Sequence, residues 1–467
     1  MELAKRLSEN VASTTFEDLT DEAIVAAKQS ILDSIGVMLA ATGAGEGVDN
    51  VMSLLDDMGG SDDCTVIANN KKTNPVFAAM ANGSIAHSID FDDVHDDAFV
   101  HPSGSVVPTA LTMGEYVHAT GKELITAVAL GNDLICRLGY AVSSPSEEQK
   151  NDIADLWMLP LLLGTFSSSA TAAKLLKLDA VQVQAALSIA SNRAAGSKQV
   201  VSESGSLRGL YCMFPNVTGT LSALLASKGV PGFDEPMNGA CGFFKMAFSN
   251  VYDGSYFDTL GKEFEGAGVS IKVWPCCRLT NSYVNAALNI ADEHDIDPEE
   301  IEKITIFYSG SPEVKRCIEP WGDKINPPSI PGAKISLPFV VGMALLQRKI
   351  NIASFTLESI KDPALLAIAA KAEIDIDETL VSDVSKTMLP GRVRVQMKNG
   401  EVYDERVEVV LGHPKNRLNW NQLNEKFMDC ASYAKRTFTQ EELLKISGVI
   451  EHLEDLDDVA DLMSLLA

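Results

Sequence analysis

The run Asn82–Gly104, NGSIAHSIDFDDVHDDAFVHPSG, is the stretch around which the chain is organised. It holds three of the seven histidines of the protein and five aspartates: His87, His95, His101, Asp90, Asp92, Asp93, Asp96 and Asp97. Histidine changes charge near neutral pH and is the commonest acid–base group in catalysis. Such a concentration of imidazoles and carboxylates predicts that this loop carries chemistry.

The residue types alone leave three interpretations open. The loop can be a proton-transfer site, in which a histidine moves the proton and an aspartate orients it. It can be a metal site with imidazole and carboxylate ligands. It can also be a solvated acidic loop that caps helices. Pro102 restrains His101 to an extended backbone, and Gly104 allows a tight turn, so we expect His101 to be held in place.

Composition limits the class of protein and its partners. A chain of 467 residues predicts two domains, and 46% hydrophobic with only 6% aromatic residues favours packed helices. The net charge of −26 argues against nucleic acid. No uncharged apolar stretch of about 18 residues or signal peptide is evident, so we expect no membrane. The eight cysteines show no C-x-x-C spacing, which predicts free thiols and a cytoplasmic protein.

Apolar periodicity predicts a mainly helical chain. Thr20 is a plausible N-cap for a helix over 17–42. Further helices are expected at 106–118, 123–142, 161–177, 180–195, 217–228, 279–294, 335–348, 420–433, 440–453 and 456–466, with a polar interruption at 144–155. Alternation predicts strands at 301–308, 392–397 and 402–410, the last two joined by an Asn-Gly turn. We therefore expect a large, discontinuous, all-helical domain at 1–266 and 405–467 and a smaller α+β domain at 267–404.

Two other segments carry candidate chemical groups. Arg208 enters a helix and can either clamp a carboxylate through parallel hydrogen bonds or lie as a surface residue at a helix end. Lys272 and Arg278 flank Cys276 and Cys277, and cationic neighbours lower the pKa of a thiol; the alternative is a buried segment at the domain junction. No glycine-rich phosphate loop, nucleophile elbow or H-E-x-x-H helix occurs.

These residues resemble the MmgE/PrpD family, which includes 2-methylcitrate dehydratases, cis-aconitate decarboxylases and iminodisuccinate epimerases. The resemblance covers nearly the whole chain and rests on Asn82-Gly83, His87, Asp90-Phe91-Asp92-Asp93, His101-Pro102-Ser103-Gly104, Leu32–Gly36, Lys272 with Pro275, Ile335–Phe339 and Gly412-His413-Pro414. It implies a helical domain built from both chain ends, an α+β lid, an active site between them, a homodimer, and no metal or other cofactor.

The resemblance also implies roles, residue by residue. Asp90 and His101 match active-site positions, although their separation is one residue longer than in the decarboxylase pattern, and Val94 stands where that pattern has threonine. Lys272 matches a lysine of the lid, and Cys277 takes the place of a lid histidine.

Two departures affect the expected chemistry more. Met158 stands where a histidine is expected, and a thioether cannot transfer a proton. Arg208 stands where a lysine is expected, and arginine is a poor proton donor at neutral pH.

The family reactions remove or deliver a proton next to a carboxylate-bearing carbon. We therefore expect a lyase or isomerase that acts on a small di- or tricarboxylate, with His101 as base or acid, Asp90 orienting it and Cys277 as the opposing acid or base. The catalytic candidates are His101, Asp90, Cys277 and Lys272, and the substrate-binding candidates are Arg208, Asp93 and Lys272. The alternatives are a two-base epimerase of an iminodisuccinate-like substrate and a non-catalytic carboxylate-binding protein.

Overall fold

A computed structural model describes residues 2–143, 156–203, 207–382, 385 and 390–467. The chain divides into two compact units: unit 1 is Met1–Val269 with Asn419–Ala467, and unit 2 is Ser270–Leu418. The polar interruption expected at 144–155 lies outside the described residues. The expected boundary after residue 404 falls inside strand β6, Val402–Val407, so the chain returns to unit 1 later than predicted, at Asn419.

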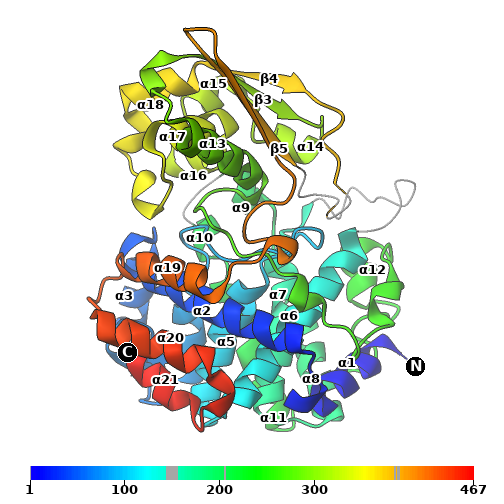
Figure 1. The fold of residues 1–467 in the computed structure, drawn as a ribbon. Helices are drawn as coiled ribbons and strands as arrows, with labels where there is room; N and C mark the ends of the chain where they lie inside the picture. Colours follow the sequence, from blue (N-terminus) through cyan, green and yellow to red (C-terminus); the bar gives the residue numbers. More distant parts are fainter. Residues whose placement is uncertain (1, 144–155, 204–206, 383–384, 386–389) are drawn as a thin grey trace. The chain divides into compact units, whose positions relative to one another are not determined.

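Unit 1 is built mainly of helices (Figure 1). They are α1 (Leu3–Ser13), α2 (Asp21–Ala44), α3 (Val48–Met58), α4 (Pro75–Ile85), α5 (Pro102–Tyr116), α6 (Gly121–Ser143), α7 (Leu159–Leu175), α8 (Ala180–Ser191), α9 (Gln199–Ser202), α10 (Leu207–Leu210), α11 (Met213–Ser227), α12 (Phe243–Phe248), α19 (Trp420–Ala431), α20 (Gln440–Glu451) and α21 (Val459–Leu466). Unit 1 also contains a short antiparallel hairpin of β1 (Cys64–Val66) and β2 (Lys71–Thr73).

Close helix packing fixes the helices around the site. Helix α7 packs against α5, α6, α8 and α11, and its Ser167, Ser168 and Ser169 are fully buried. A Cβ atom on Gly219 of α11 would lie only 2.3 Å from the Cβ atom of Ser168, so this crossing requires glycine. Helix α7 in turn packs against α5, whose N-terminus follows the Asp/His loop.

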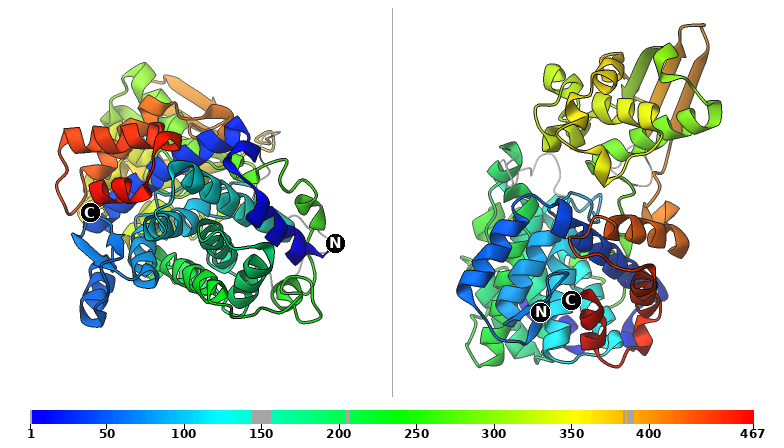
Figure 2. Two further views of the ribbon diagram at one scale, coloured as in Figure 1. Left: turned by 90° about the horizontal axis from the view of Figure 1, so that it is seen from below. Right: turned by 90° about the vertical axis from the view of Figure 1, so that its left-hand side faces the viewer.

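Both ends of the chain contribute to unit 1, as predicted. The Thr20 hydroxyl accepts a hydrogen bond from the Ala23 N–H at 3.2 Å and begins α2. Helix α19 packs against α2, so the C-terminal helices lie beside the N-terminal ones (orange to red beside blue in Figures 1 and 2).

Helices α2 and α6 are long and apolar enough to cross a membrane by length and composition. However, 83% and 94% of their most apolar windows are buried inside the protein. Burial of that extent is typical of core helices in a folded domain.

Unit 2 combines a four-stranded sheet with helices. The sheet has the order β4-β3-β5-β6, in which only β4 is parallel to its neighbour. Its elements are α13 (Asn281–His294), β3 (Ile301–Tyr308), α14 (Pro312–Lys315), α15 (Trp321–Ile325), α16 (Ile330–Lys334), α17 (Leu337–Gln347), α18 (Pro363–Ala369), β4 (Ala372–Ile376), β5 (Gly391–Met397) and β6 (Val402–Val407). The mainly helical fold class with a smaller α+β domain is confirmed.

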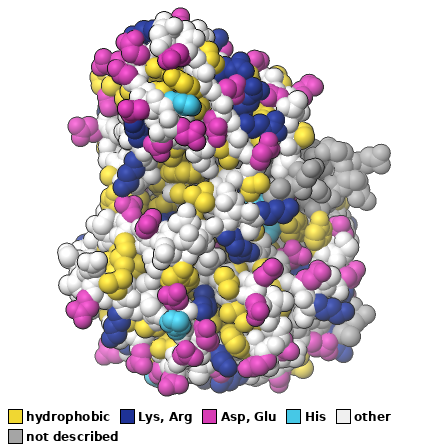
Figure 3. Space-filling model, in the orientation of Figure 1, with side chains coloured by type: hydrophobic (Ala, Val, Ile, Leu, Met, Phe, Trp, Pro, Cys, Tyr) yellow, Lys and Arg dark blue, Asp and Glu magenta, His cyan; other side chains and the backbone are white. Residues whose placement is uncertain are grey.

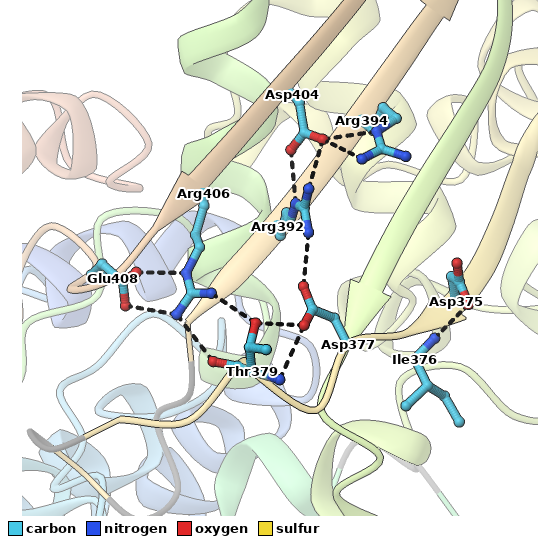
Figure 4. A network of polar contacts seen from close by, with 9 residues as sticks. All are labelled: Asp375, Ile376, Asp377, Thr379, Arg392, Arg394, Asp404, Arg406 and Glu408. Atoms are coloured by element: carbon cyan, nitrogen blue, oxygen red, sulfur yellow. Dashed lines mark hydrogen bonds and ion pairs between the residues drawn. The ribbon is translucent and has the colours of Figure 1, made fainter.

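The two faces of this sheet differ. Val393 and Val395 of β5 are fully buried, and α13 packs against β5 and β6; the right-hand view of Figure 2 shows the helices of unit 2 on one side of its strands. The alternate residues Arg392 and Arg394 carry ion pairs on the opposite face (Figure 4). Acidic side chains are spread over the visible face of each unit (Figure 3), as the net charge requires.

Candidate active site

The loop between α4 and α5 is held by its own backbone. The Asp90 N–H donates to the His87 carbonyl at 2.9 Å, and Asp90 adopts the left-handed region with φ of +56°. The His95 N–H donates to the Val100 carbonyl, also at 2.9 Å. Pro102 opens α5, where its fixed φ suits the first helical position. His101 is thereby placed at the N-cap of α5, as its restrained sequence context predicts.

Asp92 joins two histidines in the interior of this loop. Its Oδ1 atom lies 2.7 Å from His87 Nδ1, and its Oδ2 atom lies 3.1 Å from His101 Nδ1. The two imidazole rings meet edge to face with centroids 4.8 Å apart. Asp92 and Asp93 are each 1% exposed, so the interpretation as a solvated acidic loop is wrong.

Burial sets the charge states of this group. It lowers the pKa of His87 in spite of the neighbouring Asp92, so His87 is neutral at pH 7 and its Nδ1–H donates to Asp92. Burial by itself would raise the pKa of Asp92, but His87 and His101 together hold that pKa well below its ordinary value. Asp92 is therefore ionised, with His87 donating to its Oδ1 atom and the His101 ring close to its Oδ2 atom.

The hydrogen bonds of His101 fix its tautomer. His101 Nδ1 lies 2.8 Å from the main-chain carbonyl oxygen of Asp93, and a carbonyl oxygen can only accept. Nδ1 therefore carries the proton, and Nε2 keeps the lone pair. The side chain of His101 is 19% exposed, compared with 3% for His87. His101 is thus the histidine of this pair that can present Nε2 to a substrate.

Asp93 anchors the start of α5. The Ser103 N–H donates to its carboxyl group at 3.1 Å, the Ser103 hydroxyl also donates, and the Ser30 hydroxyl lies 3.3 Å away. Burial raises the pKa of Asp93 to about 7, against the Ser103 hydrogen bonds and with help from nearby Asp33. These contacts are with protein groups, so the expected contact between Asp93 and the substrate stays a prediction.

Arg208 lies at the same loop. Its Nη2 atom donates to Asp90 Oδ2 at 3.1 Å, and the two side chains are 18% and 15% exposed. The predicted partner of His101 is Asp90, but the carboxylate that lies at His101 Nδ1 is that of Asp92. The reason is local: the left-handed turn at Asp90 brings its carboxylate to Arg208. The expected cationic group, the Arg208 guanidinium, is therefore present at the loop, where it is paired with the Asp90 carboxylate.

The remaining candidates, Lys272 and Cys277, belong to unit 2. Lys272 is 1% exposed, and Cys277 is half-buried at the start of a 3-10 helix. The eight cysteines are free thiols, as predicted. A hydrogen bond with Cys277 is the main cause that raises the pKa of Cys317 well above its usual value, so the two thiols are neighbours. The catalytic roles of Lys272 and Cys277 stay predictions.

The departures from the decarboxylase pattern have defined places in unit 1. Met158 is the N-cap residue of α7 and makes no side-chain capping hydrogen bond. Val94 is 8% exposed and packs within the loop. Neither side chain can donate or accept a proton.

One group in the described part of the chain has the residue types of a metal site. The potential ligand atoms of His87, Asp92 and His101 all lie within 4.8 Å of one another, and two imidazoles with one carboxylate suit a transition metal. Both Nδ1 atoms already donate hydrogen bonds, so a metal ion could bind these histidines only through their Nε2 lone pairs.

Sequence reasoning singled out His101 and missed its partners. Nothing in the spacing separates Asp92 from Asp90 or Asp93, because all three lie within four residues of one loop. His87 was part of the motif, but no role was expected of it. Nothing in the sequence indicates that the Cys317 thiol, forty residues beyond Cys277, lies beside it.

The chain belongs to the MmgE/PrpD family. The family's N-terminal domain matches residues 5–253 and its C-terminal domain matches residues 274–452, which confirms the resemblance drawn from the Asp/His loop.

Its relatives include several enzymes of one activity. The chain is 27% identical to the cis-aconitate decarboxylase of Mus musculus, over 96% of this chain and 90% of that protein. It is 26% identical to the enzyme of the same name from Homo sapiens, over 96% and 91% of the two chains. It is 24% identical to the cis-aconitate decarboxylase of Aspergillus terreus, over 86% and 83%.

Proposed function

We propose that this protein is a lyase that acts on a small di- or tricarboxylate and moves a proton at a carbon atom next to a carboxylate, without a metal or another cofactor. The observation that carries the proposal is the fixed tautomer of His101, whose Nδ1–H is held by the Asp93 carbonyl and lies beside the Asp92 carboxylate. The decarboxylase names of its relatives support a lyase.

The same atom serves either lyase reaction. In a decarboxylation, CO2 leaves, an electron pair remains on carbon, and a protonated Nε2 of His101 delivers the proton to that carbon. In a dehydration, a neutral Nε2 takes a proton from carbon while hydroxide leaves with a proton from another acid. Ionised Asp92 stabilises the imidazolium in both cases.

Cationic groups would hold the substrate. A substrate carboxylate can replace Asp90 at the Arg208 guanidinium, since both carboxylates offer the same pair of oxygens. Lys272 and Cys277, in unit 2, are proposed as a second carboxylate-binding group and the opposing acid or base. A homodimer in the cytoplasm completes the proposal.

A non-catalytic carboxylate-binding protein is the second candidate. Two observations favour it: Met158 replaces a proton-transferring residue, and Arg208 is already paired with Asp90. Binding of carboxylates without any turnover would decide for this candidate.

The test is turnover of cis-aconitate, 2-methylcitrate and related di- and tricarboxylates, followed by CO2 release and by proton NMR in heavy water. We expect net conversion of at least one compound, and we expect His101→Ala to lower kcat/KM by roughly 10²- to 10⁴-fold. The matched control is His118→Ala, because the His118 side chain is 72% exposed and should not matter.

Three other outcomes contradict the proposal. Unchanged turnover in His101→Ala removes His101 from the mechanism. Deuterium incorporation without net conversion indicates an epimerase. Thermal stabilisation by these compounds without exchange or conversion indicates a binding protein.

A further inference from the structure

Tyr211 is a buried side chain that touches the histidine pair. It is fully buried, and its ring lies against the His87 ring with centroids 4.6 Å apart. It follows α10 and comes three residues after Arg208. Residues three apart in a helical turn lie on the same side, so the phenol and the guanidinium both belong to the surroundings of the Asp/His loop.

The hydroxyl group of Tyr211 is buried without a proper partner. Among the residues that the structure describes, no group forms a hydrogen bond of ordinary geometry with it. Burial raises the pKa of the Cys212 thiol and a hydrogen bond from Tyr211 lowers it in part, but a thiol is only a weak hydrogen-bonding partner. Buried hydroxyls are nearly always paired, and an unpaired one lowers stability. A phenylalanine would fill the same space without that cost, so the hydroxyl requires a functional explanation.

The charges around Tyr211 make it a permanent donor. Burial, with the neighbouring Cys212, Asp92 and Asp90, raises the pKa of Tyr211 well above its ordinary value, against the effect of Arg208. The phenol therefore keeps its proton throughout the neutral range, and it can donate a hydrogen bond but cannot act as a base.

We propose that Tyr211 is a further substrate-binding residue, whose hydroxyl donates a hydrogen bond to a carboxylate oxygen of the bound ligand. A ligand carboxylate that replaces Asp90 at Arg208 enters the group of side chains that surrounds the phenol. The ligand then supplies the acceptor that the free protein lacks. This inference rests on the proposed function only for the class of ligand, a small di- or tricarboxylate.

The test separates binding from structure with one substitution, Tyr211→Phe. Propane-1,2,3-tricarboxylate is the probe, because it has no double bond and cannot be decarboxylated as cis-aconitate can. Calorimetric titration should show its Kd rising about 10-fold, the effect of one lost hydrogen bond. The Tm of the free variant should be unchanged or slightly higher, because the free protein loses only the weak interaction with the Cys212 thiol.

The matched control removes another hydroxyl from unit 1. In Tyr140→Phe the ring keeps its stacking on Tyr256, with centroids 4.8 Å apart, and Kd for the probe should stay at the wild-type value. An equal rise in Kd in both variants would overturn the assignment, because the effect on binding would then not be specific to the Tyr211 hydroxyl.

The remaining outcomes are distinct. An unchanged Kd in Tyr211→Phe overturns the inference, and a lower Tm with unchanged Kd shows that the hydroxyl is structural. Wild-type binding without turnover contradicts the lyase proposal but leaves the Tyr211 result valid. If the wild type binds neither the probe nor cis-aconitate, both proposals fall.

Discussion

The Asp/His loop of unit 1 and the charged face of the sheet in unit 2 contain similar side chains in opposite environments. On the sheet, Arg392 binds Asp377 and Asp404, and Arg394 binds Asp404 (Figure 4), with exposed fractions between 12% and 41%. In the loop, Asp92 is 1% exposed. Solvent screens the ion pairs on the sheet, so each pair contributes little to the free energy of unfolding. In the buried Asp/His loop an unpaired charge is costly, so each charged group must keep its partner.

Charge density in a sequence does not by itself locate a catalytic site. Burial decides whether a carboxylate can fix a histidine, because only a desolvated interaction is strong enough to hold one tautomer.

Asp92→Asn should break the buried group most severely. The amide has the shape of the carboxylate but no charge, so it cannot stabilise the imidazolium of His101. We expect kcat/KM for the substrate to fall on the order of 10³-fold, while the circular dichroism spectrum of the folded variant stays that of the wild type.

The control is Asp97→Asn in the same loop, whose side chain is half-buried and lies outside the His87–Asp92–His101 group. It should keep turnover within a factor of about two. Full activity in Asp92→Asn would return the orienting role to Asp90, and Asp90→Asn would then have to show the loss.

Asp93→Asn should change the pH dependence of stability. The pKa of about 7 in the folded protein exceeds the ordinary value of 3.8, so the folded state binds this proton more tightly than the unfolded state. The stabilisation by protonated Asp93 is complete below the ordinary pKa and is lost as pH rises through about 7. Asp93→Asn should not show this loss of unfolding free energy, which in the wild type amounts to at most about 1.4 kcal/mol per pH unit between the two pKa values.

Denaturant unfolding of the wild type and Asp93→Asn at pH 5, 6 and 7 measures this effect. The difference in unfolding free energy between the two proteins should shift in favour of the variant as pH rises, since all other groups are shared. If the unfolding free energies of the two proteins change with pH in parallel, Asp93 titrates normally and its burial does not alter its pKa.

The sequence predicted the helices of unit 1 because long apolar periodicity, with caps such as Thr20, specifies them locally. It missed β4, because the alternating run Ala372–Ile376 is only five residues long and mostly exposed, and its pairing with β3 is a tertiary event. The resemblance to the MmgE/PrpD family identified His101, and Pro102 predicted that this side chain is held in place. The sequence could not choose Asp92 over Asp90, because that choice depends on the left-handed turn at Asp90 and on Arg208, which lies 118 residues away.

Arg394→Gln should have the smallest effect of the set, and it sharpens the comparison from the exposed side. Its partner Asp404 keeps two hydrogen bonds from Arg392, at 2.8 and 2.9 Å, so no charge is left unpaired. We expect a loss of about 0.5 kcal/mol in the free energy of unfolding, measured by denaturant titration and reduced further in 1 M salt, where screening is nearly complete. A loss above about 2 kcal/mol that persists in salt would mean that this face behaves like a buried network, and exposure would then not be what separates the two regions.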